Sequence, residues 1–359
     1  MTAGPLSDAE RIAWLRLART PNVGPVAFEH LLHRCGSAGA ALAALPGLAR
    51  RPVDIPSMAE AERELDAGEA LGARLICLGE PGFPARLAAL DPPPPLIWTL
   101  GGADILRLSC VAIVGARVAS AAGQRFAREL ALALGQAGHV VVSGMARGVD
   151  GAAHQGALAS GTVAVLGGGV GDIYPPEHAD LYDRIAQQGC IVSESPPDHR
   201  AQARDFPRRN RLISGLSRAV VVVEAELKSG SLITARLAAE QGREVLAVPG
   251  SPLDPRARGT NDLIRQGAAV CEGVEDVLRV LEDARDLADR DRPPWTGRPA
   301  EPSDALRQRV AALLSPTAVT VDDLVRAVAA PAPEVFAALV ELSLSGEAVF
   351  GPGGTVSGE

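Results

Sequence analysis

Seven short apolar runs, separated by helix-sized segments, constrain the fold of this chain more than any other feature. They are rich in Val, Ile and Leu and lie at 110–115, 139–144, 162–168, 190–194, 219–225, 244–250 and 268–272. Continuous apolar runs of this length indicate strands buried on both faces, and the intervening helices indicate that the strands are parallel. The sequence therefore predicts an α/β domain over residues 105–285, with a doubly wound, Rossmann-like and mostly parallel sheet.

The segment before this domain has a different pattern. Residues 1–90 contain amphipathic helical stretches, and "TPNVGPVAFEHLL" resembles a helix-hairpin-helix turn, although an ordinary helix–helix turn has the same pattern. We therefore predict a helical domain over 1–90, similar to a sterile-alpha-motif or helix-hairpin-helix domain. The run "DPPPPL" fixes an extended backbone, so 91–104 is predicted to be a Pro-rich connector.

The segment after the sheet domain begins with a polar, Pro-rich stretch, 286–303, which is typical of a linker. Residues 304–359 then contain three short helical patterns and a Gly-rich hairpin, the outline of a winged helix. The stretch in the position of its recognition helix, "APEVFAALVELSLSG", has no Lys or Arg. Because helices that read DNA present basic or polar groups, we expect this domain to contact protein rather than DNA.

The charge of the chain limits how it can interact with a polyanion. The net charge is −8, which argues against coating nucleic acid by bulk charge. Residues 105–281 nevertheless hold 19 basic against 18 acidic residues, and this is the only part of the chain where cations are not outnumbered. A local cationic groove in the sheet domain remains compatible with this distribution.

Several other classes of protein are disfavoured. The five cysteines are scattered and form neither a metal-binding spacing nor a CxxC pair, so we expect no metal. No signal-peptide pattern opens the chain and the apolar runs are of strand length, so we expect a cytoplasmic protein without a membrane partner. The sheet domain lacks both the G-x-G-x-x-G pattern and a P-loop, and we predict no cofactor.

Ligands of doubly wound sheets bind beyond the carboxyl ends of the strands, so the loops there hold the candidate site. In the first loop, Gly115 allows a tight exit and Arg117 offers a planar fork for a phosphate. The second loop offers Ser143, Gly144 and Arg147. Asp150 and His154 follow with a spacing that could suit acid–base chemistry, but helix capping by Asp150 and packing of His154 explain it better.

Two later loops add further anion-binding groups. Arg208, Asn210 and Arg211 lie at the start of a helix, where amides and guanidinium groups can bind an anion, although such clusters are often only a solvated face. Lys228 is the only lysine among 35 basic residues and follows the most apolar run. It is a compact charge, and Ser229, Gly230 and Ser231 open the next helix with free amides and hydroxyls. Several loops with such donors suit a polyanion better than a mononucleotide.

These motifs resemble the DNA-processing protein A family, also called Smf. The resemblance is carried by "VAIVGAR", "SGMARGVDGAAH", "FPRRNRLISGLS", "KSGSLITARLAAEQGREVLAVPG" and "GTNDLIRQGA", in the order of the family. It implies a non-enzymatic protein of natural transformation, competence and DNA recombination, which binds and protects single-stranded DNA, loads the RecA recombinase and forms a homodimer. It also implies that Arg117 and Lys228 contact phosphates and that Gly144, Arg147, Asn210 and Arg211 line the same groove.

Other readings of the sequence stay open. Only 3% of the residues are aromatic, so binding through phosphates with little sequence preference is expected, and Tyr174 and Phe206 are the nearest residues for base stacking. The alternative function is a nucleotide-processing enzyme related to the phosphoribohydrolases, which would need a P-G-G-x-G-T-x-x-E loop. The nearest string, "PGSPLDPRARGTNDL", breaks that pattern and offers Asp262 in place of the catalytic Glu. A scaffold with a relict groove is a third reading.

Overall fold

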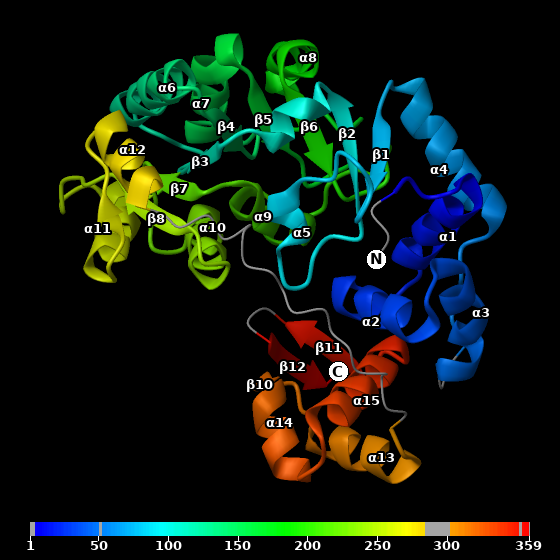
Figure 1. The fold of residues 1–359 in the computed structure, drawn as a ribbon. Coiled ribbons are helices and arrows are strands. Elements are labelled where there is room, and N and C mark those ends of the chain that lie inside the picture. Colours follow the sequence, from blue (N-terminus) through cyan, green and yellow to red (C-terminus); the bar gives the residue numbers. More distant parts are fainter. Residues whose placement is uncertain (1–3, 50–51, 284–301, 352–353, 359) are drawn as a thin grey trace. The chain divides into compact units, whose positions relative to one another are not determined.

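The computed structural model describes residues 4–49, 52–283, 302–351 and 354–358 of the chain (Figure 1). The chain divides into two compact units. One unit contains Glu64–Asp291, and the other joins Gly4–Arg63 to Arg292–Glu359. The second unit is therefore assembled from both ends of the sequence.

A nine-stranded sheet forms the centre of the first unit, with strand order β1-β2-β6-β5-β4-β3-β7-β8-β9. Strands β3 to β9 are mutually parallel and coincide with the seven apolar runs, which confirms the predicted doubly wound fold. The strands are β1 (Arg74–Cys77), β2 (Leu96–Gly101), β3 (Cys110–Val114), β4 (Val140–Ser143), β5 (Thr162–Val165), β6 (Cys190–Ser193), β7 (Ala219–Val222), β8 (Glu244–Ala247) and β9 (Ala269–Val270).

The order of the strands reverses between β3 and β7. From β3 the chain builds β4, β5 and β6 outward in one direction, then returns and builds β7, β8 and β9 in the other. β3 and β7 pair in parallel from Val111↔Ala219 to Val114↔Val222. Reversals of this kind leave a crevice beyond the carboxyl ends of the two strands, where ligands of such folds bind.

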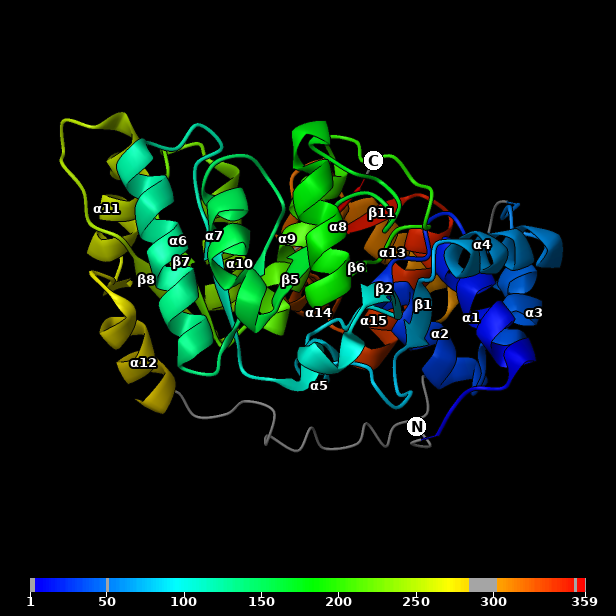
Figure 2. The same cartoon turned by 90° about the horizontal axis from the view of Figure 1, so that it is seen from above.

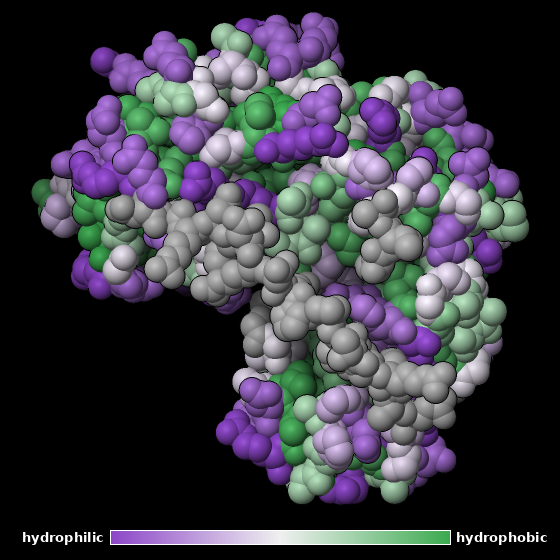
Figure 3. Space-filling model, in the orientation of Figure 1, coloured by the Kyte–Doolittle hydropathy of each residue, from purple (hydrophilic) through white to green (hydrophobic). Residues whose placement is uncertain are grey.

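Helices cover both faces of the sheet because alternate residues of its strands point to opposite sides. In β3, Val111 and Ile113 pack in the core under α6 (Ala121–Gln136), α7 (Val149–Ala157) and α12 (Val274–Asp283). Cys110, Ala112 and Val114 pack in the core under α9 (Asp205–Leu216) and α10 (Gly230–Glu240). Helices α6, α7 and α8 (Ala179–Gln188) lie side by side on one face (Figure 2), and hydrophilic side chains are spread over their outer surface (Figure 3).

The positions of two strands contradict the predicted domain boundaries. β1 and β2 pair in antiparallel fashion, and β2 also pairs with β6, so the sheet begins well before residue 105. The prediction of a helical domain to residue 90 and a connector over 91–104 was therefore wrong in this part. The prolines end before Leu96, and Leu96–Trp98 are buried in β2 between β1 and β6, a strand that the four consecutive prolines before it obscured.

The second unit contains the remaining helices and a small sheet. Its N-terminal part holds α1 (Asp8–Arg19), α2 (Pro25–Cys35), α3 (Ala38–Leu48) and the start of α4 (Met58–Ala70). Its C-terminal part has the predicted winged-helix outline, with the sheet order β10-β12-β11. The elements are α13 (Asp304–Leu313), β10 (Val319–Thr320), α14 (Val321–Val328), α15 (Ala332–Leu344), β11 (Ala348–Gly351) and β12 (Thr355–Gly358). The predicted linker 286–303 lies outside the described residues except for its last two positions.

Helix α15 occupies the position of a recognition helix, yet it is buried almost throughout its length. It packs against α2. The Arg34 guanidinium lies 2.9 Å from Glu341, which also pairs with Arg307, and the rings of His30 and Phe336 are 5.9 Å apart. In this arrangement α15 contacts protein of its own chain, and its face is not available to a DNA groove.

The helices of the described residues differ from membrane-spanning helices in length and polarity. No single helix there is both long enough and apolar enough to cross a bilayer, and α14 with α15 reaches the required length only as a pair bent by 114°.

The ion pair between α2 and α15 gives a local stability prediction. The side chains of Arg34 and Glu341 are 17% and 7% exposed, so the pair is largely desolvated, and removal of Arg34 leaves the buried Glu341 carboxylate with Arg307 in place of two arginines. We expect Arg34→Ala to weaken the packing of α15 by about 1–3 kcal/mol. Hydrogen exchange followed by mass spectrometry should then show faster exchange in α15 and unchanged exchange in β3 and β7. The matched control is Arg125→Ala, which removes an exposed pair on α6; equal protection of α15 in both variants would contradict the prediction.

Candidate nucleic-acid interface

The two loops that follow β3 and β7 meet at the point where the strand order reverses. The Glu224 carboxylate accepts hydrogen bonds from both the hydroxyl and the amide of Ser120, which is the N-cap of α6. Gly115 lies between the loops, and a Cβ there would lie 2.7 Å from the Val149 side chain. Arg117 and Lys228 are both exposed and leave these neighbouring strands at the same edge of the sheet. Two exposed cations thus lie on loops that leave adjacent strands, and their contact with phosphate stays a prediction.

Arg117 extends from this edge over an aromatic ring. Its guanidinium carbon is 5.3 Å from the centroid of the Phe206 ring, a distance typical of a cation–π contact. The Tyr174 ring lies 5.7 Å from that of Phe206, and Tyr174 is 47% exposed. An arginine and two aromatic rings, from two loops and the first turn of α9, are therefore gathered at the carboxyl edge.

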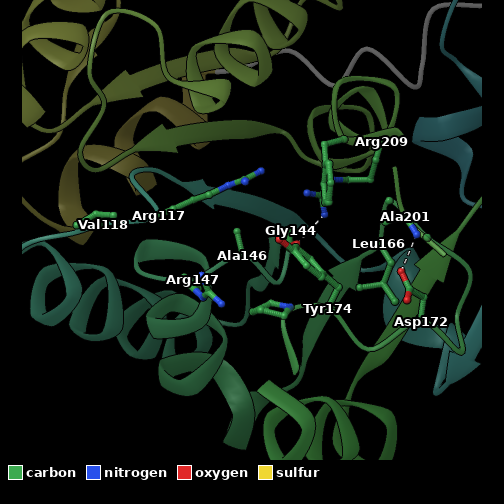
Figure 4. A pocket seen from close by; sticks show the side chains of 14 residues that line it. Arg117, Val118, Gly144, Ala146, Arg147, Leu166, Asp172, Tyr174, Ala201 and Arg209 are labelled. Carbon is green, nitrogen blue, oxygen red and sulfur yellow. Dashed lines mark hydrogen bonds between the residues drawn. The ribbon is translucent and has the colours of Figure 1, made fainter. Parts of the chain in front are cut away.

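These side chains line a pocket of about 220 Å³ (Figure 4). Its walls combine guanidinium groups, aromatic rings and glycine backbone, with one carboxylate, Asp172. The main contributors are Arg117, Arg147, Arg209, Tyr174, Phe206, Gly144, Gly167 and Gly168. A pocket with flat apolar walls and cationic rims suits a planar ring attached to an anionic group.

Arg209 supports the pocket from below. Its guanidinium is buried and donates hydrogen bonds to the carbonyl oxygens of Gly144, at 2.7 Å, and Val165, so it joins the loops that follow β4 and β5. Burial lowers the pKa of Arg209 to about 10. A Cβ on Gly144 would lie 2.7 Å from a guanidinium nitrogen of Arg209, so a larger residue there would displace the guanidinium.

Asp150 and His154 serve the fold rather than acid–base chemistry. The Asp150 carboxylate accepts from the amides of Gly144 and Ala146, and the cap of α7 is Gly148, not Asp150 as predicted. Burial raises the pKa of Asp150, with nearby Arg209 opposing that shift. His154 is fully buried beside the hydroxyl of Thr162, and burial lowers its pKa to about 3.

Comparison with known proteins identifies the family. The family model described as DNA recombination-mediator protein A matches residues 74–282, a DprA-like N-terminal HHH domain matches 8–67, and a DprA winged helix domain matches 293–354. The chain belongs to the DNA processing protein A (DprA) family. The match to an HHH domain confirms the resemblance of "TPNVGPVAFEHLL" to a helix-hairpin-helix turn.

Individual DprA relatives are similar to this chain over most of their own length. Protein Smf of Escherichia coli is 38% identical over 278 residues, which cover 76% of this chain and 74% of that protein. The X-ray structure of DprA from Streptococcus pneumoniae superposes with a TM-score of 0.64 at 28% identity, covering 77% of this chain and 98% of that one. DprA from Helicobacter pylori superposes with a TM-score of 0.54 at 30% identity, covering 59% and 97%.

Two residues predicted as part of the site near the end of β4, Ser143 and Arg147, differ from each other in their surroundings. Ser143 is fully buried and its hydroxyl donates to the Ile113 carbonyl oxygen at 2.6 Å, so it cannot reach a ligand. Arg147 is exposed, lines the pocket and pairs with Glu177. Of this loop, Gly144, Ala146 and Arg147 line the pocket, whereas Ser143 does not.

The predicted cluster on α9 does not form a single anion site. Arg208 is exposed, Asn210 is buried and donates to the Gly230 carbonyl oxygen at 3.3 Å, and Arg211 pairs with Glu194. None of the three lines the pocket. Consecutive helical residues point in directions about 100° apart, so the run could not direct all its charges to one place.

The loop after β7 has the predicted form at the start of α10. Ser229 is the N-cap, its hydroxyl accepts from the Ser231 amide at 3.3 Å, and the two hydroxyls are 2.7 Å apart. A Cβ on Gly230 would meet open space, so its amide is approachable. Lys228 is exposed and, within the described ranges, has no ion-pair partner. These groups form a second cationic position on the edge that carries Arg117.

Two contributors were not identified as contacts from the sequence. Arg209 belongs to the basic run of Arg208, Asn210 and Arg211 but was not among the predicted contacts, and Asp172 was not considered. A signal for Arg209 existed, because Phe206 and Arg209 are three residues apart and share one face of α9. No sequence pattern pointed to Asp172.

The buried position of Arg209 gives a second stability prediction. Arg209→Met keeps the volume approximately but leaves the Gly144 and Val165 carbonyl oxygens without their donor. We expect a loss of about 2–4 kcal/mol in the free energy of unfolding, measured by urea denaturation. Arg208→Met, which changes an exposed residue next to it, serves as the control; equal stabilities of the two variants would be inconsistent with this role of Arg209.

Proposed function

We propose that this chain binds single-stranded DNA along the carboxyl edge of its sheet, from the Lys228 loop across Arg117 to the pocket. The observation that carries the proposal is that Arg117 and Lys228 leave the adjacent strands β3 and β7, while Arg117 also lines the pocket. The DprA relative from Helicobacter pylori, described for its single-stranded DNA binding mode, supports the same ligand class.

The two parts of this surface suit two parts of a nucleotide. Arg117, Lys228 and the amides at the start of α10 can bind phosphate oxygens, since helix N-termini and cations both favour anions. The Tyr174 and Phe206 rings offer flat faces on which a base can stack, and stacking accepts any base. DNA bound in this way is recognised by its backbone and by one or more bases, with little sequence preference.

Further roles follow from membership of the DprA family. We propose that the bound strand is protected in the cytoplasm during natural transformation and transferred to the RecA recombinase, with the protein acting as a homodimer. Family membership and the DprA names of the relatives support these roles. A non-enzymatic function stays a prediction: Asp262, the nearest residue to the catalytic Glu of the alternative enzyme, pairs with Arg265 and does not line the pocket.

Binding to fluorescently labelled oligo(dT), followed by anisotropy over a range of salt concentrations, tests the phosphate contacts. We expect Arg117→Ala and Lys228→Ala each to weaken binding several-fold and to reduce the slope of log K against log salt by about 0.7–1, because each removes one phosphate contact. Arg236→Ala removes a cation from an exposed pair near the other end of α10 and should change neither. Wild-type affinity in both Arg117→Ala and Lys228→Ala would refute the proposed site.

Replacement of Tyr174 tests the base-stacking part. Tyr174→Ala removes a half-exposed ring and should weaken oligo(dT) binding by about 1–3 kcal/mol with an unchanged salt slope, because no phosphate contact is lost. Tyr174→Phe retains the ring and should bind like the wild type. Equal losses in the two variants would mean that the hydroxyl, not the ring, is used.

A further inference from the structure

Arginines at the carboxyl edge of the sheet fall into two groups. Three of them are paired with carboxylates: Arg147 with Glu177, Arg211 with Glu194, and Arg256 with Asp254. Other basic residues of this edge have no ion pair in the part of the chain that the structure describes. They include Arg117, Arg208 and Lys228. Some cations of this edge can thus bind an anionic ligand directly, whereas others are already paired with an acidic side chain.

Two of the three pairs also hold the fold together. Arg211 and Glu194 are only 21% and 25% exposed, so their pairing compensates charges that are largely desolvated. Asp254 accepts from the backbone amide of Arg256 as well as from its guanidinium, and it caps a short helical turn. Arg147 and Glu177 are different, because both side chains are about half exposed, at 59% and 47%.

Glu177 is held close to Arg147 by the backbone around it. It lies on the 3-10 turn η3 (Pro176–His178), just after Tyr174, and the His178 ring contacts the Met145 carbonyl oxygen at 3.0 Å. Arg147 lies on the loop of Met145 and lines the pocket. The guanidinium also lowers the pKa of the Glu177 carboxyl, which keeps it ionised at neutral pH. A negative charge therefore lies against Arg147, one of the cations that line the pocket.

We propose that Glu177 is an internal competitor for phosphate, occupying the Nε donor of Arg147 until single-stranded DNA displaces it. This inference rests on the function proposed above and assigns a role to a residue outside the predicted contacts. An exposed pair contributes little to stability, so a phosphate can replace the carboxylate at small cost. The result is a pocket whose affinity for DNA is held below the value that its arginines alone would give.

The exchange has a specific signature in salt. When a phosphate binds a cation that carries no internal partner, the ions condensed on the DNA are released and binding becomes salt-dependent. While Glu177 competes for Arg147, this arginine contacts a phosphate in only part of the complexes, so it contributes less than one phosphate contact to the salt slope. Removal of the Glu177 charge should therefore restore one phosphate's contribution to the salt slope.

The test is Glu177→Gln in the full chain, with labelled oligo(dT) as the probe. We expect binding about 2- to 5-fold tighter at low salt, and a salt slope steeper by about 0.7. Glu177→Ala should change both quantities in the same direction, which separates loss of charge from the hydrogen bonds of glutamine. Glu240→Gln is the matched control, since it removes a carboxylate from the exposed Arg236 pair on α10 and should bind like the wild type.

The direction in which Glu177→Gln changes the affinity for oligo(dT) decides between the two roles of Glu177. If Glu177 instead oriented Arg147 for phosphate, Glu177→Gln would bind more weakly, and weaker or unchanged binding overturns the inference while leaving the proposed function intact. A lowered melting temperature of Glu177→Gln would also overturn it, because the carboxylate would then serve the fold. If the wild-type protein itself does not bind oligo(dT), the proposed function and this inference fail together.

Discussion

The parallel pairing of β3 with β7 determines where everything else in the sheet domain can act. Three strands lie between them in the chain, yet their register brings Val114 beside Val222, so both strands end at one level. The loops that follow cannot diverge, because Glu224 of one holds the hydroxyl and amide of Ser120 in the other. The buried, apolar strands β3 and β7 thus set the positions of two exposed cations, Arg117 and Lys228, which lie on exposed loops.

The parts of the fold that the sequence predicted are those governed by burial. Strands covered on both faces must be apolar at every position, and β3 to β9 were recognised for that reason. β1 and β2 were missed because an edge pair next to a proline run lacks that signal. Strand order is not written in any local pattern, so the meeting of the Arg117 and Lys228 loops needed three-dimensional structure, although each loop was identified separately.

The errors in the site have the same origin. Arg208, Asn210 and Arg211 were grouped because they are consecutive, whereas a helix turns them to an exposed face, a buried contact with Gly230 and a pair with Glu194. Ser143 was grouped with Gly144 although strand alternation turns its hydroxyl into the sheet. Acidic and basic residues are nearly equal in number in this domain. The positive potential at its surface therefore depends on which arginines are paired or buried, and composition does not show this.

The second unit joins the two ends of the chain, since α15 packs on α2 through buried apolar residues and the Arg34–Glu341 pair. Protein domains fold during synthesis from the N-terminus onward. The sheet domain can therefore complete its core on the ribosome, whereas the first sixty or so residues must wait for the last helix to emerge. Until α15 has been synthesised, His30 and Arg34 of α2 lack their partners Phe336 and Glu341, so the N-terminal helices stay incomplete while the sheet domain is already formed.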